Sequence, residues 1–166
     1  KRLLIREFVP HDFAAMPVES EAGMPEALFL KKESLTDYIR HQYGFYEYGI
    51  WALVDHSTGR LVGRAGICNL DLDGQEEFLE AAKNNDTPVE LGYHIFSPYR
   101  RNGYGKEACR AILSYGAAAV SERIYARIHE GNHASIKLAE GLGFRFIART
   151  HSGSDPGMCL YEWNCS

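Results

Sequence analysis

The chain has 166 residues, a length that suits one domain with a single sizeable core. Hydrophobic residues make up 45% and charged residues 24%, a balance typical of globular proteins that argues against disorder. The net charge of −4 argues against a nucleic-acid binder, and no apolar run approaches the roughly 20 residues of a membrane span. We therefore expect no nucleic-acid partner and no membrane partner.

The spacing of the cysteines bears on the cellular compartment of the protein and on whether it binds a metal. The four cysteines form no C-x-x-C pair, and their spacing resembles neither a zinc site nor a disulfide framework. We expect reduced thiols in a cytoplasmic protein, with no metal. These residues are Cys68, Cys109, Cys159 and Cys165.

The first half of the chain predicts strands around a helical segment. Residues 2–8 alternate weakly and predict a strand, whereas Pro17, Gly23 and Pro25 predict broken helices over 11–45. Two segments rich in β-branched and aromatic residues, joined by a turn at residues 56–59, predict an antiparallel hairpin. Its strands are 48–55 and 61–70, and the acidic stretch 71–88 that follows predicts a loop with a short helix at Glu76–Lys83.

The second half predicts alternating strands and helices. From Lys106, apolar residues recur at helical spacing, and Asn132 is a good N-cap for a second helix that runs to about Leu142 and ends at Gly143. The irregular segment before the first of these helices is 97–105. The predicted strands are 89–96, 123–129, 144–150 and 158–164. This order predicts a mixed α+β sheet that is largely antiparallel at its two ends.

The segment between the strand 89–96 and the next helix carries the chemical signal. Gly103 and Gly105 allow successive backbone N–H groups to point into one concavity, and the following helix adds its own unpaired N–H groups and its dipole. Arg100 and Arg101 place two cations at the mouth. These features predict a cradle for a diphosphate.

The run Arg100-Arg101-Asn102-Gly103-Tyr104-Gly105 resembles motif A, R/Q-x-x-G-x-G/A, of the GCN5-related N-acetyltransferase (GNAT) family. Residues 90–95 resemble the family's preceding strand, and the N-x-x-S at 132–135 with the L-G-F at 142–144 resembles its following helix. The likeness covers about residues 89–146, and the element order over 1–88 agrees. It is greatest to the branch of the ribosomal-protein alanine acetyltransferases.

The resemblance implies a single N-acetyltransferase domain over 1–166. The implied fold has a central twisted, mostly antiparallel sheet, with its fourth and fifth strands parallel and splayed and helices on both faces. It also implies acetyl-coenzyme A as co-substrate, with its diphosphate on the N–H groups from Arg101 to Lys106 and its pantetheine arm along Ile95 and Phe96. Asn132 would bond near the thioester, and Ser135 would lie beside the sulfur. The implied cofactor residues are Ile95, Phe96, Arg100, Arg101, Asn102, Gly103, Tyr104, Gly105, Lys106 and Asn132.

Acetyl transfer requires a neutral amine, which makes a general base useful. Glu90, on the strand that leads into the cradle, is the predicted base, through a water molecule; the alternative is a structural ion pair. A backbone N–H near Ile95 or Phe96 could stabilise the oxyanion. Many family members place a tyrosine acid where this chain has Ala139, so Ser135 is the substitute candidate. The thiolate could also leave unaided, since the pKa of a thiol is about 8.5.

Three other motif matches are discounted. Gly103-x-Gly105-x-x-Ala108 fits a dinucleotide fingerprint, but six residues separate it from the strand. His129-Glu130-Gly131-Asn132-His133 fits a zinc motif, but its first histidine ends a strand. The stretch 69–80 imitates a calcium loop, but it follows a strand and begins with asparagine.

The predicted activity is transfer of an acetyl group to a primary amine, on a protein amino terminus or a small molecule. The alternative from another class is a non-catalytic acyl-coenzyme A binding or sensing domain, which the missing tyrosine at Ala139 favours. Aromatic residues over 43–51 are either core or the lining of an acceptor pocket. The oligomeric state, monomer or homodimer, is left open.

Overall fold

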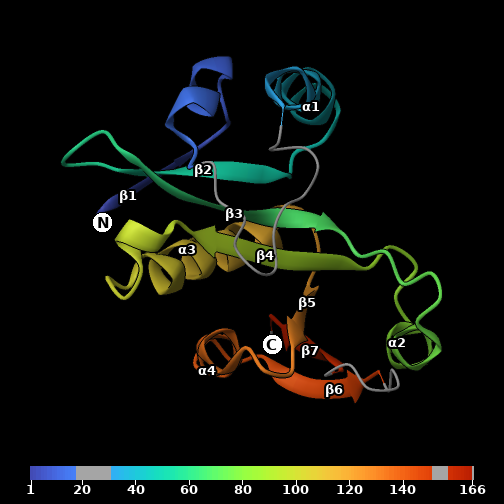
Figure 1. Ribbon diagram of the computed structural model, residues 1–166. Helices are drawn as coiled ribbons and strands as arrows, with labels where there is room; N and C mark the ends of the chain where they lie inside the picture. Colours follow the sequence, from blue (N-terminus) through green and yellow to red (C-terminus); the bar gives the residue numbers. More distant parts are fainter. Residues whose placement is uncertain (18–30, 151–156, 166) are drawn as a thin grey trace. The chain divides into compact units, whose positions relative to one another are not determined.

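The computed structural model describes residues 1–17, 31–150 and 157–165. Within them, seven strands form one sheet in the order β1-β2-β3-β4-β5-β7-β6 (Figure 1). The expected mixed α+β class is confirmed, because the sheet is mostly antiparallel and β4 and β5 pair in parallel. By its internal contacts the chain divides into two units: residues 1–66 with 93–108, and residues 67–92 with 109–166.

The first unit contains the predicted hairpin. β1 (Leu3–Arg6) pairs antiparallel with β2 (Ile50–Asp55), and β2 pairs antiparallel with β3 (Leu61–Asn69). Seven of the nine β3 residues are buried, although the strand contains two glycines. The completely inaccessible side chains of the hairpin include Leu53 of β2 and Val62 of β3, as expected for strands rich in β-branched and aliphatic residues.

The helical part of the first unit comprises the short 3₁₀ helix η1 (Pro10–Ala15) and the helix α1 (Lys32–Phe45). Tyr43 of α1 accepts a hydrogen bond from the Phe8 N–H at 3.2 Å and donates one to the Ile50 carbonyl. Tyr43 therefore joins the helix to the sheet, which makes it a structural residue. The expected break within 11–45 is confirmed where η1 ends, and the remainder of that segment, 18–30, lies outside the described residues.

The second unit is built around β5 (Arg123–His129), β7 (Met158–Asn164) and β6 (Arg145–Arg149), with β7 antiparallel to both neighbours (Figure 1). The helix α2 (Glu76–Ala82) packs beside β6. A buried cluster joins α2, the loop before it and the strands; it consists of Leu70, Leu72, Phe78, Ala82, Tyr125 and Leu160.

The parallel pair in this unit is short. β4 (Val89–Ile95) pairs with β5 through two residue pairs, Val89 with Ile124 and Glu90 with Tyr125. The helix α3 (Tyr104–Ala119) connects the two strands along the chain. A Cβ on its Gly116 would lie 2.5 Å from Ile67 and 2.8 Å from Ile124, so the missing side chain lets this helix approach the sheet closely.

The last helix, α4 (His133–Glu140), has the predicted caps. The Asn132 side chain accepts a hydrogen bond from the Ser135 N–H at 3.1 Å. Regular helix stops two residues before the expected end, but Gly143 closes it as expected, with a φ of 96°. The Gly143 N–H donates to Glu140 and the Phe144 N–H to Ala139, which are the two hydrogen bonds of a Schellman motif.

One expectation about the loop is wrong in detail. Residues 97–105 were expected to be irregular throughout, yet they contain the 3₁₀ helix η3 (Ser97–Tyr99), and α3 begins at Tyr104 rather than Lys106. Pro98 occupies an early position of η3, where its fixed φ suits a helical turn. The Glu107 N–H donates to the Gly103 carbonyl at 3.1 Å, so the first turn of α3 already includes Gly105.

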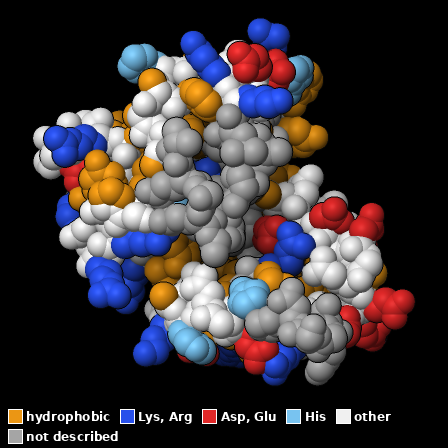
Figure 2. All heavy atoms as spheres, in the orientation of Figure 1, with side chains coloured by type: hydrophobic (Ala, Val, Ile, Leu, Met, Phe, Trp, Pro, Cys, Tyr) orange, Lys and Arg blue, Asp and Glu red, His pale blue; other side chains and the backbone are white. Residues whose placement is uncertain are grey.

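The surface carries both signs of charge (Figure 2). Acidic side chains gather over α2, where Glu76, Glu77 and Glu80 are exposed. Among the described residues, no helix has the length and apolar character needed to cross a bilayer.

Two glycines of the first unit allow a matched test of packing. A Cβ on Gly66 would lie 2.0 Å from the Gly49 carbonyl oxygen and 2.5 Å from the Ile50 Cα, so Gly66→Ala must push β3 away from β2. We expect the free energy of unfolding to fall by about 1–3 kcal/mol. Gly44→Ala, in α1 with no atom within 4 Å, should raise it by about 0.5–1 kcal/mol. Urea unfolding measures both, and equal stability of the two variants would contradict the packing argument.

Candidate functional site

The predicted cradle lies entirely in the first unit, between the end of β4 and the first turn of α3. The Phe96 N–H donates to the Val62 carbonyl at 3.0 Å, and the Tyr99 N–H then donates to the Phe96 carbonyl at 2.8 Å. These two bonds turn the chain out of the strand. They also correct one expectation, because the Phe96 N–H is already bonded and is not free for a pantetheine arm or an oxyanion.

Two residues of the loop have left-handed backbone conformations, Arg101 with φ of 62° and Gly103 with φ of 81°. This conformation costs a residue with a Cβ roughly 1–2 kcal/mol, so the strain at Arg101 needs compensation. The Asn102 side chain supplies it by donating to the Tyr99 and Arg100 carbonyls, each at 3.1 Å. Because the C=O and N–H of a trans peptide point in opposite directions, a held Arg100 carbonyl turns the Arg101 N–H outward.

The backbone N–H groups from Arg101 to Lys106 have no hydrogen-bond acceptor in the part of the chain that the structure describes. Those of Tyr104 to Lys106 belong to the first turn of the 16-residue helix α3, where the helix dipole adds positive potential. Alternating left-handed residues and unpaired N–H groups form an anion-binding nest. That this nest holds a diphosphate stays a prediction.

The cationic side chains near the cradle differ in whether they bond to the protein or are exposed to solvent. The Arg100 Nε donates to the Ile95 carbonyl at 2.9 Å, so this guanidinium folds back on the end of β4. Arg101 and Lys106 are exposed and leave their charges at the surface of the loop. The Ile95 carbonyl, which was expected to pair with a pantetheine arm, already accepts this bond from Arg100.

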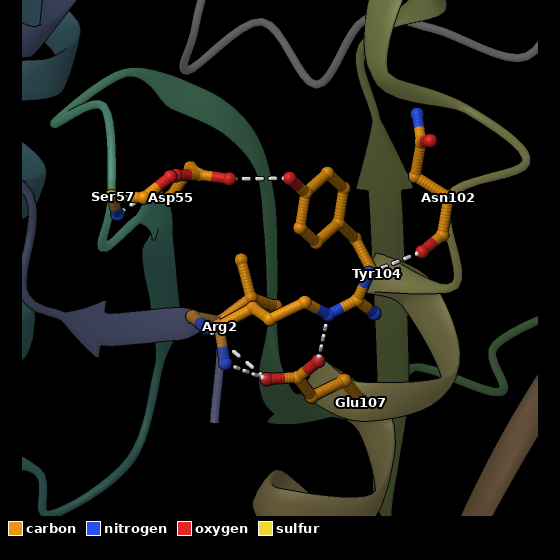
Figure 3. Close-up of polar contacts among 7 residues, drawn as sticks. Arg2, Asp55, Ser57, Asn102, Tyr104 and Glu107 are labelled. Carbon is orange, nitrogen blue, oxygen red and sulfur yellow. Dashed lines mark hydrogen bonds and ion pairs between the residues drawn. The ribbon is translucent and has the colours of Figure 1, made fainter.

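The side chain of Tyr104, the first residue of α3, contacts a buried carboxylate (Figure 3). Its hydroxyl donates to Asp55, whose other oxygen accepts from the Ser57 N–H at 2.9 Å and the Ser57 hydroxyl at 2.6 Å. The bonds from Ser57 and then from Tyr104 hold the pKa of Asp55 well below its usual range. The same bond raises the pKa of Tyr104, because the Asp55 carboxylate holds its proton.

The predicted base, Glu90, lies in the second unit. Its two carboxylate oxygens accept hydrogen bonds from Arg127, from Nε at 3.0 Å and from the terminal nitrogen at 2.6 Å. A further bond joins Arg127 to the Asp71 carbonyl at 2.9 Å, which fixes the guanidinium in place. The structure thus contains the ion pair that was the alternative interpretation of Glu90, and a catalytic role for this residue stays a prediction.

The remaining site residues also lie in the second unit. Asn132 uses its side-chain oxygen to cap α4, which leaves the amide NH₂ as the group for the predicted contact near the thioester. Ser135 lies in the first turn of α4 and is half-buried. Ala139 is buried in the same helix, with 4% of its surface exposed. The assignments of Asn132 to a cofactor and of Ser135 to acid catalysis stay predictions.

The two histidines of the discounted zinc motif, His129 and His133, do not share one helix, as the sequence predicts. His129 ends β5 and His133 begins α4, with Gly131 and Asn132 between the two elements. The His129 ring accepts from the Gly131 N–H at 3.1 Å. Among the described residues, no group of three potential ligands is placed to hold a metal ion.

Three residues that take part in the polar contacts around the cradle were missed at the level of sequence: Arg2, Asp55 and Glu107. Asp55 precedes Ser57, Thr58 and Gly59, a typical signature of a turn capped by an aspartate, so its local role could have been found. The contacts of Arg2 and Glu107 span more than a hundred positions, and no local pattern indicates them.

The family model described as the acetyltransferase (GNAT) domain matches residues 2–145. The chain belongs to the GNAT acetyltransferase family. It is 31% identical over 121 residues to the uncharacterized protein YkkB of Bacillus subtilis, a match that covers 70% of this chain and 62% of YkkB. The chain therefore spans less than two thirds of that curated relative.

Solved structures share the fold. A putative GNAT-family acetyltransferase from Bordetella pertussis has a TM-score of 0.75 at 22% identity, covering 97% of this chain and 95% of the other. The YncA structure from Salmonella typhimurium, described with acetyl-CoA, has a TM-score of 0.73 at 16% identity and covers 100% and 95%. A ribosomal-protein-S5-alanine acetyltransferase from Vibrio fischeri has a TM-score of 0.73 at 15% identity and covers 99% and 93%.

Asp55 gives a prediction about pH. A carboxyl with a depressed pKa in the folded state stabilises the fold above its unfolded pKa of about 3.9, and this contribution is lost as the pH falls through the folded pKa. We expect Asp55→Asn to lower the thermal midpoint at pH 7, and the deficit relative to wild type to shrink as the pH falls below about 4. Thermal unfolding between pH 2 and 8 measures it. Asp86→Asn, at an exposed residue, is the control, and a deficit independent of pH would contradict the assignment.

Proposed function

We propose that the chain transfers the acetyl group of acetyl-coenzyme A to a primary amine, on a protein amino terminus or a small molecule, within a ternary complex. The observation that carries this proposal is the unpaired row of N–H groups from Arg101 to Lys106 at the start of α3. Family membership makes acetyl-coenzyme A the expected donor of the acetyl group.

The residues of the cradle fit a diphosphate. The N–H groups that Arg101 and Gly103 turn outward are suitable donors for its oxygens, and Arg101 and Lys106 add exposed cations. The Asn102 side chain holds the strained backbone from behind. Binding therefore requires little reorganisation, and a preorganised site loses less conformational entropy on binding.

Acetyl-coenzyme A would supply an activated thioester. The chain's part is to hold the amine against it and to remove the amine's proton, which we assign to Glu90 through a water molecule. The bonds from Arg127 orient the carboxylate and leave each oxygen a further lone pair for a water. The Ser135 hydroxyl is the proposed proton donor to the departing sulfur, since Ala139 cannot supply one.

Two of the four cysteines, Cys109 and Cys159, are poorly suited to form an acyl-enzyme. Cys109 is fully buried, and burial raises the pKa of its thiol to about 12, so little thiolate forms at neutral pH. The Cys159 thiol is also buried and has a raised pKa. Neither group is suited to be a nucleophile.

Of these two classes of acceptor we propose the amino-terminal amine, as in the ribosomal-protein alanine acetyltransferase branch. The basis is the Glu90-Leu91-Gly92-Tyr93 strand together with Asn132 and Ser135, and the fold likeness to the Vibrio fischeri enzyme is compatible with it. A panel of peptides with amino-terminal alanine against polyamines would test this choice.

A second candidate function is acyl-coenzyme A binding without catalysis. The observation in its favour is the buried Ala139, because a tyrosine acid at that position is absent from α4. Binding of coenzyme A without acetyl transfer to any amine of a broad panel would support it.

Gly103 and Gly74 allow the cradle to be tested separately from backbone strain. Both are left-handed, with φ of 81° and 74°, so the backbone strain of alanine should cost a similar roughly 1–2 kcal/mol of stability at either position. A Cβ on Gly103 would also lie 3.2 Å from a terminal nitrogen of Arg2, whereas a Cβ on Gly74 would have no atom within 4 Å. We expect only Gly103→Ala to weaken coenzyme A binding, by about tenfold, because it disturbs the N–H groups of the nest. Isothermal titration calorimetry measures the affinity. The absence of binding to the wild-type protein would refute the proposed function.

Variants of Glu90 and Arg127 test whether Glu90 is a general base or only a partner in a structural ion pair. A general base contributes about 10²–10⁴-fold to the rate, so Glu90→Gln should lower kcat by that order and flatten its rise with pH. Arg127→Gln removes the same ion pair but keeps the carboxylate, so it should retain far more activity. Steady-state kinetics over pH 6–9 measure both variants. Equal losses in the two would assign Glu90 to structure alone.

A further inference from the structure

Arg2, the residue before β1, contacts the cradle through several of its atoms (Figure 3). Its terminal nitrogen donates to the Asn102 carbonyl at 2.7 Å, and its Nε donates to the Glu107 carboxylate at 3.0 Å. Its guanidinium also lies over the Tyr104 ring, 4.9 Å from the ring centre. One side chain thus contacts the middle of the loop, the first residue of α3 and the end of its first turn.

Glu107 fixes this guanidinium in place. Its Oε1 accepts from the backbone N–H groups of Arg2 at 2.7 Å and of Leu3 at 3.1 Å, while Oε2 accepts from the Arg2 side chain. Burial raises the pKa of Glu107, but these bonds outweigh it and leave the pKa lowered, so the carboxylate remains charged at neutral pH. The carboxylate therefore ties the first residues of β1 to the start of α3.

The bond from Arg2 to Asn102 has a consequence for Gly103. The C=O of Asn102 and the N–H of Gly103 belong to one trans peptide and point in opposite directions. Since Arg2 holds the carbonyl, it also directs the Gly103 N–H away from itself. Asn102 does the same for Arg101 from within the loop, so Arg2 completes the orientation of the nest from outside it.

We propose that Arg2 is a positioning residue for diphosphate binding, which orients the Asn102–Gly103 peptide so that the Gly103 N–H faces the ligand. This inference rests on the proposed function. In this proposal Arg2 acts through the loop and is not itself a ligand of a phosphate oxygen. Its side chain is 54% exposed and that of Glu107 is 25% exposed, and ion pairs this open to solvent add little to global stability. The effect of Arg2 therefore falls on ligand affinity rather than on folding.

The test compares Arg2→Gln with the wild-type protein by calorimetry with coenzyme A and by steady-state kinetics. Loss of a charge-assisted hydrogen bond that orients a donor should raise the Kd for coenzyme A and the KM for acetyl-coenzyme A by about tenfold, with kcat within about twofold. A lysine at this position can reach Asn102 or Glu107 but cannot bond to both as the forked guanidinium does. The Kd and KM of Arg2→Lys should therefore lie between those of the wild-type protein and those of Arg2→Gln. The thermal midpoint should change little.

Arg123→Gln is the matched control. Arg123 forms an ion pair of similar exposure with Glu162, at 3.5 Å, in the second unit, and it has no assigned role in binding. Its loss should leave both the Kd and the KM unchanged.

Dephospho-coenzyme A, which retains the diphosphate but lacks the 3′-phosphate, identifies the part of the ligand that Arg2 influences. If Arg2→Gln loses affinity equally for both compounds, the proposal is supported. If it loses affinity for coenzyme A alone, Arg2 is a direct ligand of the 3′-phosphate and the proposal is overturned. Wild-type affinity in Arg2→Gln would also overturn it while leaving the proposed function intact. Failure of the wild-type protein to bind either compound would instead refute the proposed function. If Arg2→Gln does not fold, Arg2→Lys decides by the same criteria.

Discussion

The candidate site depends on one constraint, the outward orientation of the main-chain N–H groups between Arg101 and Lys106. A peptide plane that is turned outward is held there when its carbonyl has a partner on the opposite side, and the chain provides such a partner for two carbonyls of the loop. Asn102 holds the Arg100 carbonyl and Arg2 holds the Asn102 carbonyl. The hydrogen bonds that Asn102 and Arg2 make to the loop carbonyls therefore determine which backbone N–H groups the loop presents to a ligand.

This dependence explains why residues remote in sequence meet at the cradle. The loop satisfies only some of its carbonyls with its own side chains: Asn102 holds those of Tyr99 and Arg100, and glycine occupies two of the last three positions of the loop. The donor to the Asn102 carbonyl comes from elsewhere in the chain, because Arg2 supplies it and also donates to Glu107 (Figure 3). Asp55, at the end of β2, accepts a hydrogen bond from the Tyr104 hydroxyl. The N-terminal strand thus has a function beyond its place in the sheet.

Local chemistry explains which features the sequence predicts. β5 has its predicted bounds because its residues alternate strictly, and Asn132 and Gly143 cap α4 as expected because capping depends on the residue itself. The glycine spacing likewise predicts the nest. The contacts of Glu90 with Arg127, of Phe96 with Val62 and of Arg2 with Glu107 join distant segments, so the pairing of the strands had to be known first. That is why the ion pair remained one of two interpretations and why the occupied Phe96 N–H was missed.

The double capping of α4 has a consequence for its rotation. Asn132 fastens one end through the Ser135 N–H, and the left-handed Gly143 fastens the other, so the helix cannot slip by a residue along its own axis. Its angular phase is thereby set, with Ala139 turned into the interior and His133 and Glu140 turned to solvent. A bulky aromatic ring introduced at position 139 would have to displace packed neighbours, and changing the helix length by one residue would rotate Ser135 by about a hundred degrees.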